Sequence, residues 1–138
     1  MIILLNLVLA NIAGLFSGIV FDDPGGVARA LREYAGTFPD KRSSIPQGED
    51  FPYIFTSLDG FDITREGIRY KVKTEIGIFA ADGTDKAALL SSIVVGIAPL
   101  AIQRFSPYRL IGDAVCTIND ENSPYFMVAI EMVFRDHN

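Results

Sequence analysis

The side chains that could carry out catalysis are few, and they are scattered along the chain. The single histidine, His137, is the penultimate of 138 residues, and the single cysteine is Cys116. A histidine at a chain end makes a poor general base, because termini rarely hold the fixed geometry that proton transfer requires. Ser91 and Ser92 have neither a nucleophile-elbow motif nor a histidine near them in the sequence. These patterns predict a protein that is not an enzyme.

Carboxylates occur in pairs, and each pair falls in a turn, in a loop or at a helix start. The pairs are Asp22/Asp23, Glu49/Asp50, Asp59/Asp62, Asp82/Asp85 and Asp120/Glu121. Carboxylates at such positions are usually solvated or cap a helix. The run 120–122 (DEN) has oxygen ligands of the type that hard cations prefer, but no further ligands follow at a regular spacing. We expect no metal site and no cofactor.

Composition and charge narrow the class of protein. The chain is 49% hydrophobic and 21% charged, which suits one compact domain over residues 1–138 with a substantial core. Its formal net charge of −5 argues against nucleic-acid binding as the main activity, since phosphate binding needs clustered lysine and arginine. One cysteine allows neither an internal disulfide nor a cysteine-based zinc site. Cys116 lies in an apolar run, so we expect it to be a small buried hydrophobe.

The longest regular pattern in the chain runs from Arg65 to Ala80 (REGIRYKVKTEIGIFA). Apolar residues and threonine alternate there with Arg69, Lys71, Lys73 and Glu75. Successive side chains of a strand point to opposite faces, so this period of two predicts one long strand with a core side and a solvent side.

The first 18 residues are mostly apolar, and their hydrophobic residues have a roughly helical spacing. We interpret this segment as a core helix that ends near Gly14 to Gly18. A helix that docks on a partner chain, and a targeting or membrane segment, are the alternatives. No lysine or arginine precedes the apolar run, and Asn6 and Asn11 interrupt it, which disfavours the membrane alternative.

Two further features lie before residue 51. Asp23 and Pro24 are typical of a helix start, and Gly36 of a helix end, so a helix is predicted over Gly26 to Tyr34. Residues 37–50 are rich in Pro, Ser, Gly and charge and predict a long loop with a solvated tip.

Residues 51–136 predict a sheet and the helix that covers it. Strands are expected over 51–58, 109–119 and 125–136, with turns at Asp59-Gly60 and at 120–124 and a bulge at Gly112-Asp113. A helix over 86–98 follows Thr84 as its cap, and Pro99 should end or kink it. The fold class is therefore α+β: a two-layer sandwich of about four mostly antiparallel strands, with helices packed on one face.

The second half of the chain resembles the tail terminator, or tail completion, proteins of long-tailed bacteriophages and prophages. The resemblance rests on four successive segments between Pro46 and Phe134, with the N-terminal helix as preface. They are a short aromatic strand (IPQGEDFPYIFTSL), a long strand with a basic face (IRYKVKTEIGIFA), a helix (DKAALLSSIV), and two strands split by an acidic turn (AVCTINDENSPYFMVAIEMVF). Residues 24–44 have no counterpart in this pattern.

The resemblance implies a structural protein of the virion tail or neck, assembled in the cytoplasm of a bacterial host. Proteins of this family form a hexameric ring at the head-proximal end of the tail tube, stop its polymerisation and offer a surface to the head connector or stopper protein. The expected partners are therefore other copies of the chain, the tail tube protein and the connector or stopper, with no membrane. DNA would pass through the channel without specific binding, which an acidic protein permits.

A closed ring needs two different contact surfaces on each subunit. The candidates are the N-terminal helix, the long loop and the second face of the last strand. Their residues are Leu4, Leu7, Asp40, Lys41, Arg42, Met127, Glu131 and Val133, and Asp82, Asp120 and Glu121 are expected to face the channel.

Two alternatives remain open. One is another neck component, namely a head-to-tail adaptor or stopper. The other is a small non-enzymatic module that binds a ligand or a protein, which a large apolar cleft lined by Tyr53, Tyr70 and Phe79 would favour.

Overall fold

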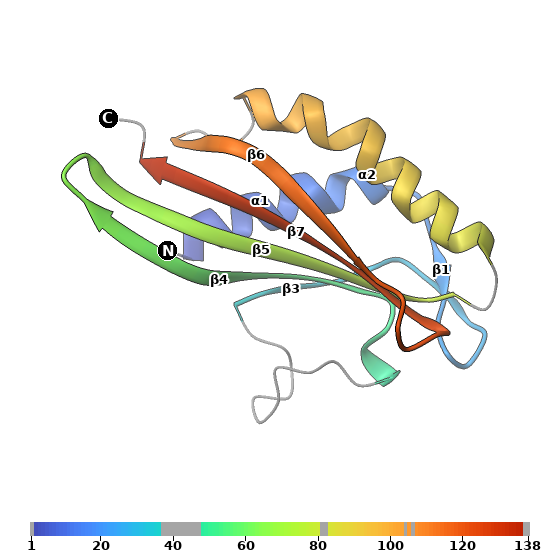
Figure 1. Cartoon of the computed structure of the whole chain (residues 1–138). Helices are drawn as coiled ribbons and strands as arrows, with labels where there is room; N and C mark the ends of the chain where they lie inside the picture. Colours follow the sequence, from blue (N-terminus) through green and yellow to red (C-terminus); the bar gives the residue numbers. More distant parts are fainter. Residues whose placement is uncertain (1, 37–47, 81–82, 104, 106, 137–138) are drawn as a thin grey trace.

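The computed structural model describes residues 2–36, 48–80, 83–103, 105 and 107–136 (Figure 1). Two α-helices, two short 3₁₀ helices and seven strands make up this part of the chain. In chain order they are α1 (Ile2–Ala13), η1 (Gly14–Phe16), β1 (Phe21–Asp22), β2 (Ala28–Arg29), β3 (Arg32–Ala35), η2 (Gly48–Asp50), β4 (Tyr53–Thr64), β5 (Gly67–Phe79), α2 (Gly83–Gln103), β6 (Tyr108–Asn119) and β7 (Tyr125–Asp136).

The main sheet has five strands in the order β3-β4-β5-β7-β6. β3 is parallel to β4, and every other neighbouring pair is antiparallel. Both α-helices lie on one face of this sheet (Figure 1), and no other α-helix occurs among the described residues. The expected α+β class with helices on one face is confirmed, although the main sheet has one strand more than expected and β1 and β2 form a further small sheet.

The core lies between the helices and the sheet. β5 is the long alternating strand that the sequence predicts, and Val72, Thr74, Ile76 and Ile78 on its helix side are all buried. α1 buries the stripe Leu4, Leu5, Val8, Leu9 and Ile12, so its interpretation as a core helix is confirmed. Within this core the hydroxyl groups of Thr56 and Thr74 are hydrogen-bonded to each other at 2.9 Å.

The helix predicted over 26–34 is wrong, because this segment forms β2 and β3. Residues 32–35 pair in parallel with residues 53–56 of β4, and this long-range pairing overrides the helix propensity of alanine, leucine, arginine and glutamate. Asp23 caps a tight turn instead of a helix. Its Oδ1 accepts hydrogen bonds from the backbone N–H groups of Gly25 and Val27, both at 2.9 Å, and its Oδ2 accepts one from Arg29 Nε at 2.7 Å.

The turn predicted at Asp59-Gly60 is also wrong. β4 continues through these residues as a β-bulge, where the register with β5 shifts between Leu58 and Gly60. The hairpin reverses at Arg65 and Glu66, and Thr64 holds this turn by accepting a hydrogen bond from the Glu66 N–H at 3.2 Å. A bulge needs the same permissive residues as a turn, so the sequence signal is similar for both.

Three further predictions concern α2 and β6. Pro99 does not end α2, which continues to Gln103. The predicted bulge near Gly112 is confirmed by a register shift between Ile111 and Val115, and Gly112 has a φ of 72°. Cys116 was expected to be buried but is exposed, because β6 is an edge strand with a neighbour on one side only. Partial desolvation of its thiol nevertheless raises the pKa.

The hydrogen bonds of Asp23 predict a pH-dependent contribution to stability. The Val27 N–H, followed by Arg29, lowers the pKa of the Asp23 carboxyl below its ordinary value. The ionised carboxylate therefore stabilises the fold above the unfolded-state pKa of about 3.9, and this stabilisation is lost as the pH falls through the lower folded-state value. We expect Asp23→Asn to lower the melting temperature by several degrees at pH 7, and the difference from the wild type to shrink in acid.

Thermal unfolding followed by circular dichroism between pH 2 and pH 7 measures this difference. The exposed neighbour Asp22 provides the control, since Asp22→Asn removes the same charge from the same small sheet. An equal loss in both variants at pH 7 would show that the hydrogen bonds of Asp23 are not the cause.

Candidate subunit interface

The interface residues predicted from the sequence differ in how much of each side chain is exposed. Leu4 is fully buried in the core of its own chain, so it serves folding and is not available to a partner. Leu7 is partly buried against the same core. Asp40, Lys41 and Arg42 lie outside the described residues. The interface predicted at the long loop therefore stays a prediction.

The second face of β7, which includes Met127, Glu131 and Val133, belongs to the open face of the sheet. Glu131 is exposed, and Val133 is half-buried. Met127 packs against a second, smaller hydrophobic cluster centred on Phe51 and Tyr53, so much of its apolar surface is already used within the chain.

Tyr53 anchors this smaller cluster on the open face, at the start of β4. Its ring is fully buried, lies opposite Gly77 in β5, and meets the Phe51 ring edge-on at 5.0 Å between centroids. The phenol donates a hydrogen bond to the Glu75 carboxylate. Burial, followed by the charge of Glu75, raises the pKa of the Tyr53 hydroxyl far above its ordinary value, so the group stays protonated and acts as a donor.

Of the acidic residues expected to face a channel, Asp120 and Glu121 lie at one end of the sheet. Asp120 and Glu121 occupy the β6–β7 turn, which meets the end of β5 through a hydrogen bond from Ala80 N–H to Pro124 O at 2.8 Å. Asp120 pairs with Lys86 at the start of α2, with Nζ–Oδ distances of 2.9 and 3.0 Å. Glu121 is exposed, and Asp82 lies outside the described residues.

The open face also contains a row of arginines that the sequence reading missed. Arg69 of β5 lies directly opposite Arg135 of β7, which lies directly opposite Arg109 of β6. Like charges directly opposite each other destabilise a sheet. Of the three, Arg135 has a carboxylate partner among the described residues, Glu66 at 3.2 Å. The sequence carried no signal for this row, because the three positions meet only through strand register.

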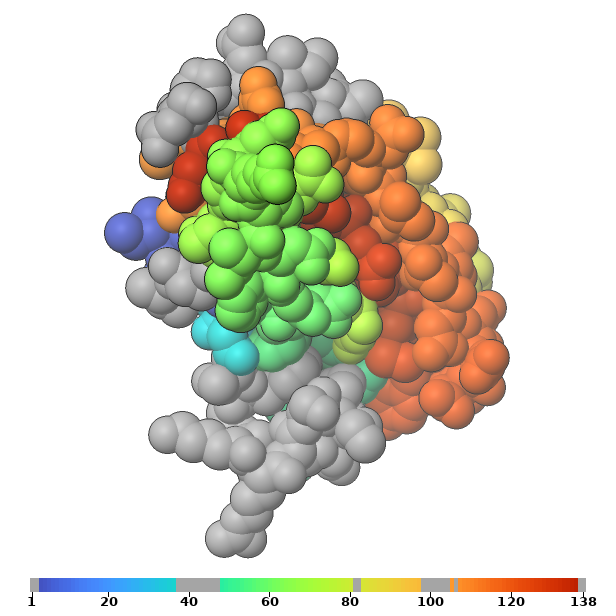
Figure 2. Space-filling view, turned by 60° about the vertical axis from the view of Figure 1, so that its left-hand side comes forward, coloured from blue at the N-terminus to red at the C-terminus, as the bar shows by residue number. Residues whose placement is uncertain are grey.

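The outer surface of α2 exposes large apolar side chains. No charged residue occurs between Lys86 and Arg104, and the side chains of Val94 and Val95 are 75% and 74% exposed. The free strand β6 adds Val115 and Ile118, each more than half exposed. Figure 2 shows β6 lying open along one side of the molecule, beside the projecting β4–β5 hairpin. Val115 lies on the open face, opposite Glu131, and Ile118 lies on the helix side, opposite Val128. We call Val94, Val95 and Ile118, which all belong to the helix side of the molecule, the exposed apolar surface.

The β4–β5 hairpin has an uncovered apolar side as well. Phe61 and Ile63 are 56% and 78% exposed, and they lie opposite Tyr70 and Ile68 on the helix side of the sheet. Tyr70 itself packs edge-on against Tyr108. Since Tyr53 and Phe79 lie on the open face and Tyr70 on the helix side, these three aromatic residues do not line one cleft.

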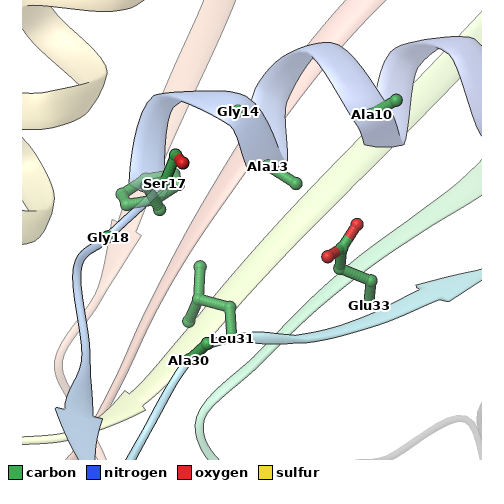
Figure 3. A pocket seen from close by; sticks show the side chains of 9 residues that line it. Ala10, Ala13, Gly14, Ser17, Gly18, Ala30, Leu31 and Glu33 are labelled. Carbon is green, nitrogen blue, oxygen red and sulfur yellow. The ribbon is translucent and has the colours of Figure 1, made fainter.

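A pocket of about 340 Å³ lies between the end of α1 and the start of β3 (Figure 3). Ala10, Ala13 and Ser17 line it from the helix side, and Leu31 and Glu33 from the strand side. Figure 3 shows the Glu33 carboxylate directed toward the helix. Neither a histidine nor a cysteine lines this pocket, and a lone carboxylate with a serine is not a catalytic pair.

The described residues contain no group of three or more His, Cys, Asp or Glu side chains placed to hold a metal ion. Within the same part of the chain, neither helix combines the length and the apolarity that crossing a membrane requires. Neither the known protein-family models nor the curated proteins include a match to this chain. The fold and surfaces define a two-layer α+β protein with exposed apolar and charged surfaces on different elements.

Proposed function

We propose that this chain is a structural virion protein that forms a ring at the head-proximal end of a phage tail tube, where it ends tube polymerisation and provides the head-joining surface. The proposal involves no catalysis and no cofactor. Its partners would be other copies of the chain, the tube protein and the connector or stopper protein.

The exposed apolar surface is the observation that carries this proposal. Soluble monomers seldom leave several large apolar side chains uncovered on a helix and on the edge strand beside it, and such side chains often mark a protein contact. Val94 and Val95 would become buried in a contact of this kind, and the free edge of β6 offers unpaired backbone groups beside them.

The arrangement of elements supports the same proposal. The order from β4 to β7, a hairpin followed by a helix and a second strand pair, is the pattern on which the resemblance to tail terminators rests. The exposed apolar residues of α2 and β6 and those of the β4–β5 hairpin lie on different elements, and a ring subunit requires two different contact surfaces.

Deletion of the gene from its phage or prophage tests the proposal, with tail lengths measured by negative-stain electron microscopy. We expect abnormally long tails without heads, because nothing would end tube growth. Tails of normal length that fail to join heads would assign the chain to the connector side of the neck instead. Normal infectious particles would contradict a role in the virion.

A further inference from the structure

The strands of the sheet carry opposite charge at their two ends. Arg69, Arg109 and Arg135 form one row at the end near the β4–β5 turn. Asp120 and Glu121 lie at the other end, and Figure 1 shows that the β1–β2 hairpin with the exposed Asp22 lies there too. Arg109 and Asn119 are ten residues apart in β6, so about 33 Å of strand separates the two ends.

The arginine row is only partly neutralised by its own chain. Glu66 binds Arg135 with one carboxylate oxygen, and Asp62, which lies opposite Arg69, is 3.6 Å from Lys71. Arg69 and Arg109 are exposed and have no carboxylate within ion-pair distance among the described residues. Arg69 and Arg109 lie on the two strands that flank Arg135, so their Cα atoms are about 10 Å apart. Three planar donors at this spacing suit a short segment with several carboxylates.

The β6–β7 turn carries negative charge, which is complementary to the positive charge of the arginine row. It protrudes beyond the sheet at the junction of β6 and β7 (Figure 1), and Glu121 is exposed at its tip. The Asn119 side chain accepts a hydrogen bond from the Glu121 N–H at 3.1 Å, which holds the turn in shape. Lys86 pairs with Asp120 and leaves the charge of Glu121 directed to solvent.

We propose that the arginine row of one copy binds the acidic β6–β7 turn of a second copy, in a head-to-tail contact. The inference rests on the proposed ring function and identifies one of its contacts. The two surfaces are different, so the contact is heterologous and repeats from copy to copy until a ring closes. A net-negative chain disfavours nucleic acid as the occupant, whereas the chain itself supplies a carboxylate-rich segment.

Charge exchange between the two surfaces tests the contact in the full chain, by analytical ultracentrifugation at low ionic strength. We expect Arg69→Glu/Arg109→Glu to weaken self-association about tenfold or more, because its glutamates would face the acidic turn. Glu121→Lys/Asn122→Lys should have the same effect and leaves the Lys86–Asp120 pair in place. An equimolar mixture of the two variants should associate again, since each contact between unlike variants joins opposite charges.

The matched control is Arg65→Glu, which makes the same charge change as Arg109→Glu at the hairpin turn but outside the row. We expect Arg65→Glu to associate as the wild type does and Arg109→Glu to associate less. Circular dichroism checks that each variant is folded. If a double variant does not fold, the single changes Arg109→Glu and Glu121→Arg are mixed instead.

Three results would overturn the proposal: a wild type that stays monomeric up to about 1 mM, variants that associate like the wild type, or a mixture that does not recover. Binding of a short DNA duplex to the row, without self-association, would also overturn it. The gene deletion reads out tail length and not self-association, so failure of the ring function and failure of this contact are distinguishable.

Discussion

Replacement of Gly77 by alanine is expected to lower the free energy of unfolding by about 3 kcal/mol, at the upper end of the usual cost of overpacking. A Cβ atom at this position would lie 2.6 Å from Cζ of Tyr53 and 2.8 Å from Cε2 of Phe51, and closer still to another ring atom of Tyr53. Neither ring can move away easily, because Tyr53 is fully buried and hydrogen-bonded to Glu75, and Phe51 packs between Tyr53 and Tyr125.

Urea unfolding of the wild type and the variant measures this loss. Gly60→Ala is the matched control, since Gly60 lies in the adjacent strand and an added Cβ would meet only Lys71, at 3.9 Å. We expect the control to change stability by less than about 0.5 kcal/mol. If Gly77→Ala were as stable as the control, the aromatic cluster would not be packed against β5 as described.

The second large effect is expected from Val94→Asp/Val95→Asp on the outer surface of α2. Both side chains are about three-quarters exposed, so the isolated chain should fold as before. In an assembled ring the new carboxylates would lie in an apolar contact, where an unpaired charge is strongly unfavourable. We expect this variant to reduce complementation of the gene deletion by about tenfold or more, a loss typical of disrupted interface centres.

Infectious titre and tail length after complementation measure this effect, and circular dichroism of the purified variant establishes that it folds. Val20→Asp serves as the control, because Val20 is 55% exposed but lies between η1 and β1, outside α2 and β6. Full complementation by Val94→Asp/Val95→Asp would show that this surface is not a contact. Equal loss in the control would indicate that added negative charge alone is harmful.

Local patterns predicted most of the large elements correctly. The period of two over β5 and the spacing of Leu4, Val8 and Ile12 in α1 reflect which side of each element is buried. This information is contained in neighbouring residues, because a strand or helix presents its faces at a fixed period. The turn at 120–124 was also recognisable, because its turn-forming residues are neighbours in the sequence.

Predictions failed where a distant partner decided the conformation. Residues 32–35 become a strand only because β4 is present to pair with them, and Asp59-Gly60 becomes a bulge only because β5 continues beside it. Cys116 is exposed because β6 is the last strand of the sheet, and strand order is a property of the whole chain.

The sequence by itself determined the α+β class, the positions of α1 and α2, and the scarcity of catalytic residue types, since composition and local periodicity depend only on neighbouring positions. The tertiary structure alone decided which surfaces remain available to a partner. Arg69, Arg109 and Arg135 are far apart in sequence and share one row only because antiparallel register aligns three strands. Val94 and Val95 look like core residues in the sequence, and they are exposed because α2 packs on the sheet through Leu89 and Ile93, which lie on its opposite side.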